Sequence, residues 1–453
     1  MTLFYGCTAL TDLDFGCGVT AIGDHAFQGC TALTGLDFGS GVTAIGSHAF
    51  QGCTALTGLD FGSGVTAIGS HAFYGCTGLT ALSVPDNVTS IGEGAFGGCS
   101  SLESITLPFV GGSDSASVAS SSTLFGYIFG TSSYTGGTRT EQYYSSTGST
   151  RYYIPASLTS VTITGGDIFY GAFNNCTFLT DIAIPDSLTN IESYVFRGCT
   201  SLASISIPDG VTSIGGYAFY GCTSLTGIVI PDNVTGIGSY AFYECTSLAS
   251  VEVGSGIASI GSYAFRYCTS LSAVGIDDIS AWCSIDFYNG LSNPLYYAGN
   301  LYLNGELVTD LVIPDGVTGI GSYAFIGCTG LTSVTIVSGV TDIGSCAFYD
   351  CAGLTGITVS DSVTGIGSYA FYRCVSLASV TIGSGVTSIE NYAFGYCTSL
   401  TTVYYTGAED EWDSITIASS GNSYLTSATV CRYSETEAEG CWHYDGDGNI
   451  AMW

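Results

Sequence analysis

Gly46-Ser47-His48-Ala49-Phe50-Gln51-Gly52-Cys53-Thr54-Ala55-Leu56 is the stretch that decides the fold, because its Ala-Phe-x-x-Cys-x-x-Leu pattern recurs almost to the end of the chain. The phenylalanine of this pattern returns every 23 residues in three long series. A fixed period in the twenties with repeating apolar positions is the signature of a solenoid of stacked coils. The three series are Phe27, Phe50, Phe73 and Phe96; Phe173, Phe196, Phe219, Phe242 and Phe265; and Phe325, Phe348, Phe371 and Phe394.

A single coil, read from Leu33 to Cys53, predicts two short strands and a turn. Leu36-Asp37-Phe38 alternates inward, outward and inward, which is typical of a strand. Gly39-Ser40-Gly41 then turns the chain, at a place where other coils carry Pro-Asp. We expect a second extended segment over 42–46 and one helical turn over 47–53. The apolar surface that one coil buries does not offset the conformational entropy lost on ordering its backbone. A single coil therefore cannot fold alone, and the stacked array is what is stable.

Three segments depart from the coil pattern. The Ser-, Gly- and Tyr-rich composition of 109–157 predicts a looped-out, partly mobile insertion. Residues 277–310 predict a variant module with a short helix and a hairpin at Asn304-Gly305. Residues 407–453 predict a second copy of this module, followed by a β-meander that caps the open end of the solenoid. Regular coils are expected over 1–108, 158–276 and 311–406.

The charge balance excludes several classes of partner. With 37 acidic residues against 6 basic ones the net charge is −31, which repels phosphate backbones and anionic lipids. No apolar run approaches the roughly 18 residues that cross a bilayer. We therefore expect neither nucleic-acid binding nor membrane insertion. The first residues enter in mid-repeat without a secretion-signal pattern, so we expect either a truncated start or a cytoplasmic chain, and we favour truncation.

The cysteines follow the repeat, since fourteen of the 19 occupy the position of Cys53. Side chains that point in parallel into a core do not face one another, so we expect buried thiols that act as small apolar groups. The chain has no Cys-x-x-Cys pair, and we predict no structural metal. Cys431 and Cys441 differ because they flank a predicted hairpin loop. They predict either a disulfide or an ordinary cross-strand apolar pair.

Columns of side chains at the same position in successive coils are candidate ligand contacts. Aspartates on the first strand could share a cation or remain separately solvated. Histidines just before the Ala-Phe pair could bind a transition metal or form a stacked ladder. Tyrosine replaces histidine at this position in later coils, which favours the ladder. The columns are Asp14, Asp37 and Asp60; His25, His48 and His71; and Tyr217, Tyr240 and Tyr263.

Asp445-Gly446-Asp447-Gly448 imitates the start of a calcium-binding loop. Ile450, however, stands where such a loop requires glycine, and the chain ends before the position of the bidentate glutamate. The segment therefore predicts a hairpin turn within the cap. No Ser-His-Asp or Cys-His set indicates catalysis.

The repeat Leu-x-x-Ile-x-Ile-Pro-Asp-x-Val-Thr-x-Ile-Gly-x-x-Ala-Phe-x-x-Cys, nearly complete from Leu225 to Cys245, resembles the BspA-like leucine-rich repeat family over most of the chain. The resemblance implies a leucine-rich-repeat solenoid, β-rich with short helical turns, that forms a curved right-handed superhelix with a parallel sheet on one face. Members are typically secreted or surface-displayed proteins of bacteria and some parasitic protists. Characterised examples are adhesins that bind host matrix proteins or other cells. The family shares no catalytic residues that could be carried over.

We therefore predict a non-enzymatic binding scaffold without a cofactor. The resemblance places it outside the cell or on the cell surface, and its ligand is expected to be a protein or a glycan, including host matrix. Binding is expected on physical grounds because the repeating surface presents rigid columns of Asp and Tyr side chains. The alternative is a structural spacer within a larger surface protein, with no ligand of its own.

Overall fold

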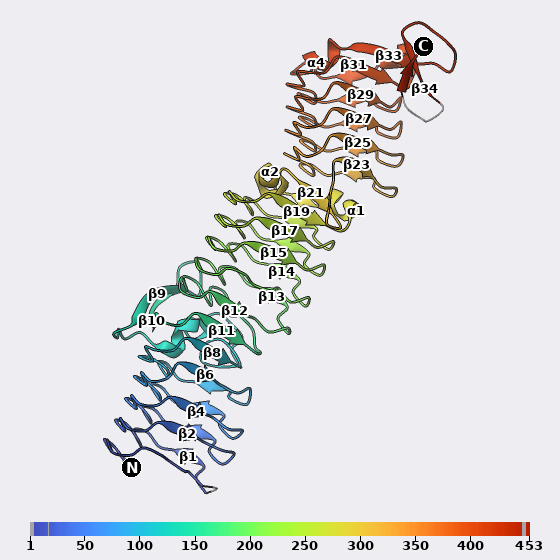
Figure 1. Cartoon of the computed structure of the whole chain (residues 1–453). Helices are drawn as coiled ribbons and strands as arrows, with labels where there is room; N and C mark the ends of the chain where they lie inside the picture. The colour runs from blue at the N-terminus through green and yellow to red at the C-terminus, as the bar shows by residue number, and fades with distance from the viewer. Residues whose placement is uncertain (1–3, 17, 446–449) are drawn as a thin grey trace. The chain divides into compact units, whose positions relative to one another are not determined.

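The computed structural model describes residues 4–16, 18–445 and 450–453. The chain divides into two compact units, Met1–Ile228 with Gly238–Leu248, and Val229–Ile237 with Ala249–Trp453. In each unit short strands of successive coils pair in parallel and in register, as the stacked arrows in Figure 1 show. The prediction of a β-solenoid built from stacked coils is confirmed.

In the first unit most regular coils contribute one strand to each of two faces. Residues 23 apart lie side by side, as in the pairs Leu36 with Leu59 and Ile45 with Ile68. One face carries β2 (Gly35–Asp37) and β4 (Gly58–Asp60), then β6 (Ala81–Ser83), β8 (Ser104–Leu107), β11 (Ser160–Ile163) and β12 (Asp181–Ala183). The other carries β1 (Ala21–Ile22), β3 (Ala44–Ile45), β5 (Ala67–Ile68) and β7 (Ser90–Ile91), then β13 (Asn190–Ile191) and β14 (Ser213–Ile214).

The second unit repeats this plan around the variant module. The module contains α1 (Ile279–Cys283), β20 (Asp286–Phe287), η3 (Gly290–Ser292), α2 (Leu295–Ala298), β21 (Leu301–Leu303) and β22 (Glu306–Leu307). Its first face begins with β17 (Ser250–Val253) and β19 (Ala273–Ile276), and continues after the module with β23 (Asp310–Ile313), β25 (Ser333–Ile336), β27 (Gly356–Val359), β29 (Ser379–Ile382) and β31 (Thr402–Tyr405). Its other face carries β18 (Ser259–Ile260), β24 (Gly319–Ile320), β26 (Asp342–Ile343), β28 (Gly365–Ile366), β30 (Ser388–Ile389) and β32 (Thr416–Ile417). The strand β15 (Gly227–Ile230) pairs with β17 on the first face, and β16 (Gly236–Ile237) pairs with β18 on the other face.

A ladder of phenylalanine rings forms the core beneath the turns. Phe50 is fully buried, and its ring stacks on Phe27 at 5.2 Å and on Phe73 at 5.4 Å between centroids. The cysteine position has a structural reason as well. Cys53 Sγ donates a hydrogen bond to the Phe27 carbonyl at 3.4 Å, and Cys76 Sγ donates to the Phe50 carbonyl at 3.3 Å. The thiol therefore fills space and also satisfies a buried carbonyl of the coil before it.

Residues 124–130 differ from the looped-out segment that composition predicts. They form η2 (Phe125–Phe129) and take a place in the ladder, where the Phe125 ring lies 5.0 Å from that of Phe173. The Phe96 N–H donates to the Ile128 carbonyl and the Phe125 N–H to the Ala172 carbonyl, both at 2.9 Å. The segment completes a coil because Phe125, Ile128 and Phe129 are apolar enough to be buried, although the residues around them are polar.

The remainder of that insertion is an antiparallel hairpin, β9 (Gly137–Tyr143) and β10 (Ser149–Pro155), preceded by the short turn η1 (Ser121–Thr123). Its fully buried Gln142 fixes the hairpin to the coils on both sides. The Gln142 side chain accepts a hydrogen bond from the Gly126 N–H at 2.7 Å and donates one to the Ala172 carbonyl at 2.9 Å.

The carboxyl-terminal cap also differs from the predicted meander. After α3 (Glu409–Trp412) and α4 (Ser423–Thr426), β33 (Thr429–Tyr433) and β34 (Cys441–Tyr444) pair in parallel. The pairing of β34 with β35 (Ile450–Met452) is antiparallel. The expected turn lies at 445–448, where 446–448 are outside the described residues. Trp442 covers the end of the core, because it is fully buried and its Nε1 donates to the Tyr405 carbonyl at 3.2 Å.

None of the helices in the described part of the chain combines the length and the apolar character needed to cross a bilayer.

Candidate ligand-contact face

The histidine and tyrosine columns stand on the turn of each coil in a left-handed backbone conformation. The φ angle is 57° at His48 and 59° at Tyr217, and Gly94 takes the same position with φ 67°. Left-handed φ costs a residue with a side chain about 1–2 kcal/mol. Cross-coil hydrogen bonds hold it there, since the His48 N–H donates to the Ser70 carbonyl at 2.9 Å and the Phe50 N–H to the Ala72 carbonyl at 2.8 Å. The conformation repeats coil after coil, so it is a property of the turn.

The three histidines form a stacked ladder. Ring centroids lie 4.7 Å apart between His25 and His48, and 5.0 Å apart between His48 and His71, with interplanar angles of 2° and 6°. Nδ1 of His25 lies 2.7 Å from Gln28 Oε1, and Nδ1 of His48 lies 2.7 Å from Gln51 Oε1. Burial, followed by the charge of neighbouring His48, lowers the pKa of His71.

This arrangement does not favour the metal-binding hypothesis for the histidines. Parallel rings direct their in-plane nitrogen lone pairs along parallel lines, whereas a zinc ion needs nitrogens converging at about 2.0–2.1 Å. The described residues contain no group of three or more His, Cys, Asp or Glu side chains that could hold a metal ion.

A larger aromatic surface lies in the carboxyl-terminal half of the first unit. Neighbouring rings of one tyrosine column lie 4.8 Å apart, and Tyr170, one residue before the column position of its coil, stacks on the end of this column at 4.9 Å. Rings of a second column, three residues further along each coil, lie 5.0 Å apart. All of these rings are half-buried. We call this surface the aromatic face; it consists of Tyr170, Tyr194, Tyr217 and Tyr240, with Tyr220, Tyr243 and Arg197.

Arg197 places a cation within the aromatic face. Its guanidinium carbon lies 5.7 Å from the Tyr194 ring centroid and 5.3 Å from that of Tyr220, which is within the range of cation–π attraction. Burial raises the pKa of Tyr217 and of Tyr220; neighbouring tyrosines add to the effect at Tyr217, and the charge of Glu244 adds to it at Tyr220. These phenols therefore stay protonated near neutral pH, where they can both donate and accept hydrogen bonds.

The other predicted tyrosine, Tyr263, belongs to the second unit. The guanidinium carbon of Arg266 lies 5.0 Å from its ring centroid. The tyrosine column of that unit is interrupted by Cys346, although Tyr369 and Tyr392 stack at 5.0 Å further along. The first unit therefore has the longer run of stacked tyrosines.

The aspartate column has a local structural role. In each coil one carboxylate oxygen accepts a hydrogen bond at 2.8 Å from the backbone N–H two residues later, as Asp14 does from Gly16, Asp37 from Gly39 and Asp60 from Gly62. All three side chains are exposed. Each carboxylate thus stabilises the glycine turn that follows its own strand.

Cys431 and Cys441 lie on neighbouring strands, one register position apart, because Arg432 pairs with Cys441. Both are free thiols in the structure, with Cys431 buried and Cys441 half-buried. Burial raises the pKa of Cys431, and Cys441 adds to this. The disulfide between them stays a prediction.

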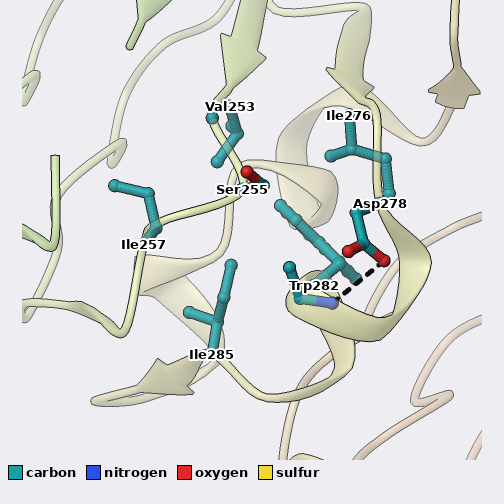
Figure 2. A pocket seen from close by; sticks show the side chains of 9 residues that line it. Val253, Ser255, Ile257, Ile276, Asp278, Trp282 and Ile285 are labelled. Atoms are coloured by element: carbon teal, nitrogen blue, oxygen red, sulfur yellow. Dashed lines mark hydrogen bonds between the residues drawn. The ribbon is translucent and has the colours of Figure 1, made fainter. Parts of the chain in front are cut away.

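A cavity under α1 is too small for a ligand. Its volume is about 10 Å³, and Figure 2 shows Val253, Ile257 and Ile285 around Trp282. Trp282 is almost completely buried, and Asp278 caps α1 by accepting hydrogen bonds from the Ser280 and Ala281 N–H groups. A space of this size holds about one water molecule.

Sequence reasoning missed the second column of the aromatic face. Arg197, Tyr220 and Tyr243 follow the column position by three residues and share the period of 23, so the repeat itself held the signal. A single turn brings both positions to the same outer surface, as the 5.6 Å between the rings of Tyr217 and Tyr220 shows.

Comparison with known proteins shows which repeat family the sequence matches. The model of the BspA-type leucine-rich repeat region matches residues 1–113, 145–290 and 299–420 in six copies. A search of curated proteins found no match. Solved structures that resemble the chain include a leucine-rich repeat protein of Bacteroides ovatus, with 23% identity over 95% of this chain and 86% of that one and a TM-score of 0.38. A leucine-rich cell-surface protein of Faecalibacterium prausnitzii has 25% identity over 74% and 90% of the two chains, with a TM-score of 0.38.

Proposed function

Because the chain belongs to the BspA-type leucine-rich repeat family, we propose that it is a non-enzymatic adhesion scaffold, displayed on a cell surface or secreted, which binds a protein or glycan ligand through the aromatic face. The observation that carries this proposal is the run of half-buried tyrosines around Arg197, spaced 4.8–5.0 Å apart.

Tyrosine and arginine, together with tryptophan, are enriched among the residues that dominate binding energy at protein interfaces. A tyrosine has two side-chain torsions, so holding it in place on binding costs little entropy. In the aromatic face the stacked neighbours already hold each ring, which lowers this cost further. Stacking hides the faces of inner rings such as Tyr217, so a ligand meets ring edges and hydroxyls that repeat once per coil.

The charge of the chain defines the preferred ligand more closely. At a net charge of −31, long-range attraction favours a ligand with basic groups, and added salt should weaken it. Within the aromatic face Arg197 supplies a positive charge and Glu244, whose charge raises the pKa of Tyr220, a negative one, so the face suits a ligand that carries hydroxyl groups and charges of both signs.

The test compares two matched double variants of the whole chain on arrays of host matrix proteins and glycans. Tyr217→Ser with Tyr220→Ser removes the centre of the aromatic face. Tyr369→Ser with Tyr372→Ser removes the equivalent pair of the second unit, whose rings lie 5.2 Å apart. We expect the first variant to lose at least about tenfold in affinity for whatever the wild-type chain retains, and the second to keep its affinity.

Two results would overturn the proposal. If the wild-type chain retains nothing above background, the spacer hypothesis gains instead. If both double variants lose affinity equally, the ligand does not distinguish the aromatic face from the tyrosines of the second unit.

A further inference from the structure

One sheet of the second unit ends with the last strand of the variant module, and the next sheet begins directly after the module. β22 is the last strand of one sheet, and β23 is the first strand of the next. β23 pairs with β25 along one edge, over all four of its residues. Its opposite edge is the edge of the sheet.

The backbone register shows which groups point to that open edge. Ile313 is in register with Ile382 through β25 and β27, and the Ile382 carbonyl accepts from the Thr406 N–H of the following coil. Alternate residues of a parallel strand direct their backbone groups to opposite sides. Ile313 therefore faces β25, and Val312 directs its N–H and carbonyl to the open edge.

A groove of about 370 Å³ lies along this edge, lined by residues that include Leu303, Leu307, Leu311 and Val312. This volume equals that of roughly ten water molecules, so it is much more than a packing gap. Leu307 is 46% exposed and Val312 is 57% exposed. Proteins usually protect an open strand edge with charged residues, above all lysine, with proline or with a covering segment. This chain contains no lysine, and β23 contains no proline.

The charges around the groove select its occupant. Glu306 and Asp310 both line it and both are exposed. A second copy of the chain would bring another net charge of −31 to the same place, which is unfavourable. An extended peptide with apolar side chains for Leu307 and Val312, and basic side chains for Glu306 and Asp310, matches the edge in both backbone and charge.

We propose that the open edge of β23 binds an extended, basic segment of a partner protein as an added strand, with Val312 supplying the backbone donor and acceptor. This site is separate from the aromatic face and does not depend on the function proposed for it. Main-chain pairing supplies affinity, and the acidic rim with the exposed Leu307 and Val312 supplies specificity.

The experiment measures binding of a labelled peptide, acetyl-Arg-Val-Thr-Val-Thr-Val-Arg-amide, to the whole chain by fluorescence anisotropy. Val312→Pro removes only the outward N–H, at an edge position where proline is tolerated. Val312→Thr is the matched control, since it keeps both the N–H and the strand preference. We expect Val312→Pro to weaken binding at least about tenfold and Val312→Thr to leave it nearly unchanged.

A second measurement keeps the test valid if Val312→Pro disturbs the fold. In the unmodified chain, the peptide should slow hydrogen exchange of the Val312 amide while leaving that of the β29 amides unchanged. Equal binding by the proline and threonine variants, absence of binding at millimolar peptide, or unchanged exchange at Val312 would overturn the proposal. A concentration-dependent dimer that Val312→Pro abolishes would also overturn it, by assigning the edge to a second copy.

Discussion

Replacing Phe50 with alanine should loosen the coils around it and leave the second unit folded. The Phe50 ring is fully buried and stacks on both Phe27 and Phe73. Truncation of a buried phenylalanine costs about 3–5 kcal/mol, and the loss of two stacked pairs places this variant toward the upper end. Because each coil contacts only its neighbours, the loss should stay local.

Hydrogen exchange with mass spectrometry measures this cost coil by coil. Amides within 24–76 should exchange about 10²- to 10⁴-fold faster in Phe50→Ala, which is the same range of free energy expressed as a rate ratio. Phe4→Ala is the matched control. The Phe4 ring also stacks on Phe27 at 5.2 Å, but it is 44% exposed, so its removal should cost about 1–2 kcal/mol.

Two outcomes would refute this reasoning. If Phe4→Ala accelerates exchange as much as Phe50→Ala does, the contribution of a phenylalanine ring to stability does not depend on its burial or on the number of rings on which it stacks. If Phe50→Ala accelerates exchange equally in 249–453, the coils do not open locally and the one-dimensional description of the stack is wrong.

The remaining predictions concern the titratable groups. Acidification should destabilise the amino-terminal coils, because burial lowers the pKa of His71 and the unfolded state then binds more protons as pH falls below the ordinary value of 6.5. Thermal melts at about pH 7.5 and pH 5.5 should differ less for His71→Tyr than for the wild-type chain, and an equal difference would contradict this. In the reduced chain, iodoacetamide should label half-buried Cys441 well before Cys53, because burial raises the pKa of Cys53 to about 12; equal labelling in a peptide map would speak against it. If Cys431 and Cys441 form the predicted disulfide, the peptide that contains them should be lighter by two hydrogens without reductant than with it. An unchanged mass would favour the alternative, an ordinary cross-strand apolar pair.

The sequence predicted the repeating architecture well, because burial and register follow directly from the period. Phe50, Cys53 and Ile45 recur at fixed spacing, and each is buried where the pattern placed it. The left-handed turn was not predicted, because residues with a side chain are uncommon in this conformation and tyrosine, as at Tyr217, is not among the types, such as histidine, that adopt it more readily. Gly94 and Gly171 at the same position were the available signal.

Composition was a weaker guide where the period breaks. The insertion is polar on average, but the short run from Leu124 to Phe129 was apolar enough to complete a coil. In the cap, alternation indicated strands without indicating direction, so the parallel pairing of β33 with β34 could not be read from it. A strand pattern is the same whether its partner runs parallel or antiparallel.

For the candidate site, the sequence identified the columns but not their surroundings. The 23-residue spacing correctly placed His25, His48 and His71 next to one another. It could not show that Asp37 turns back to the Gly39 N–H, because that contact depends on a side-chain torsion within one coil. The ligand-contact role of these columns remains a prediction that binding experiments must test.

The register that stacks the coils also has a genetic consequence. Residues 31–53 and 54–76 differ at one position, where Gln51 in the first coil corresponds to Tyr74 in the second. Each coil makes the same backbone contacts forward and backward, as the pairs Ala21 with Ala44 and Ala44 with Ala67 show. Recombination between such coding repeats would add or remove a whole coil while restoring every neighbour contact. Length variants of this chain are therefore expected to arise in multiples of 23 residues and to fold without compensating substitutions.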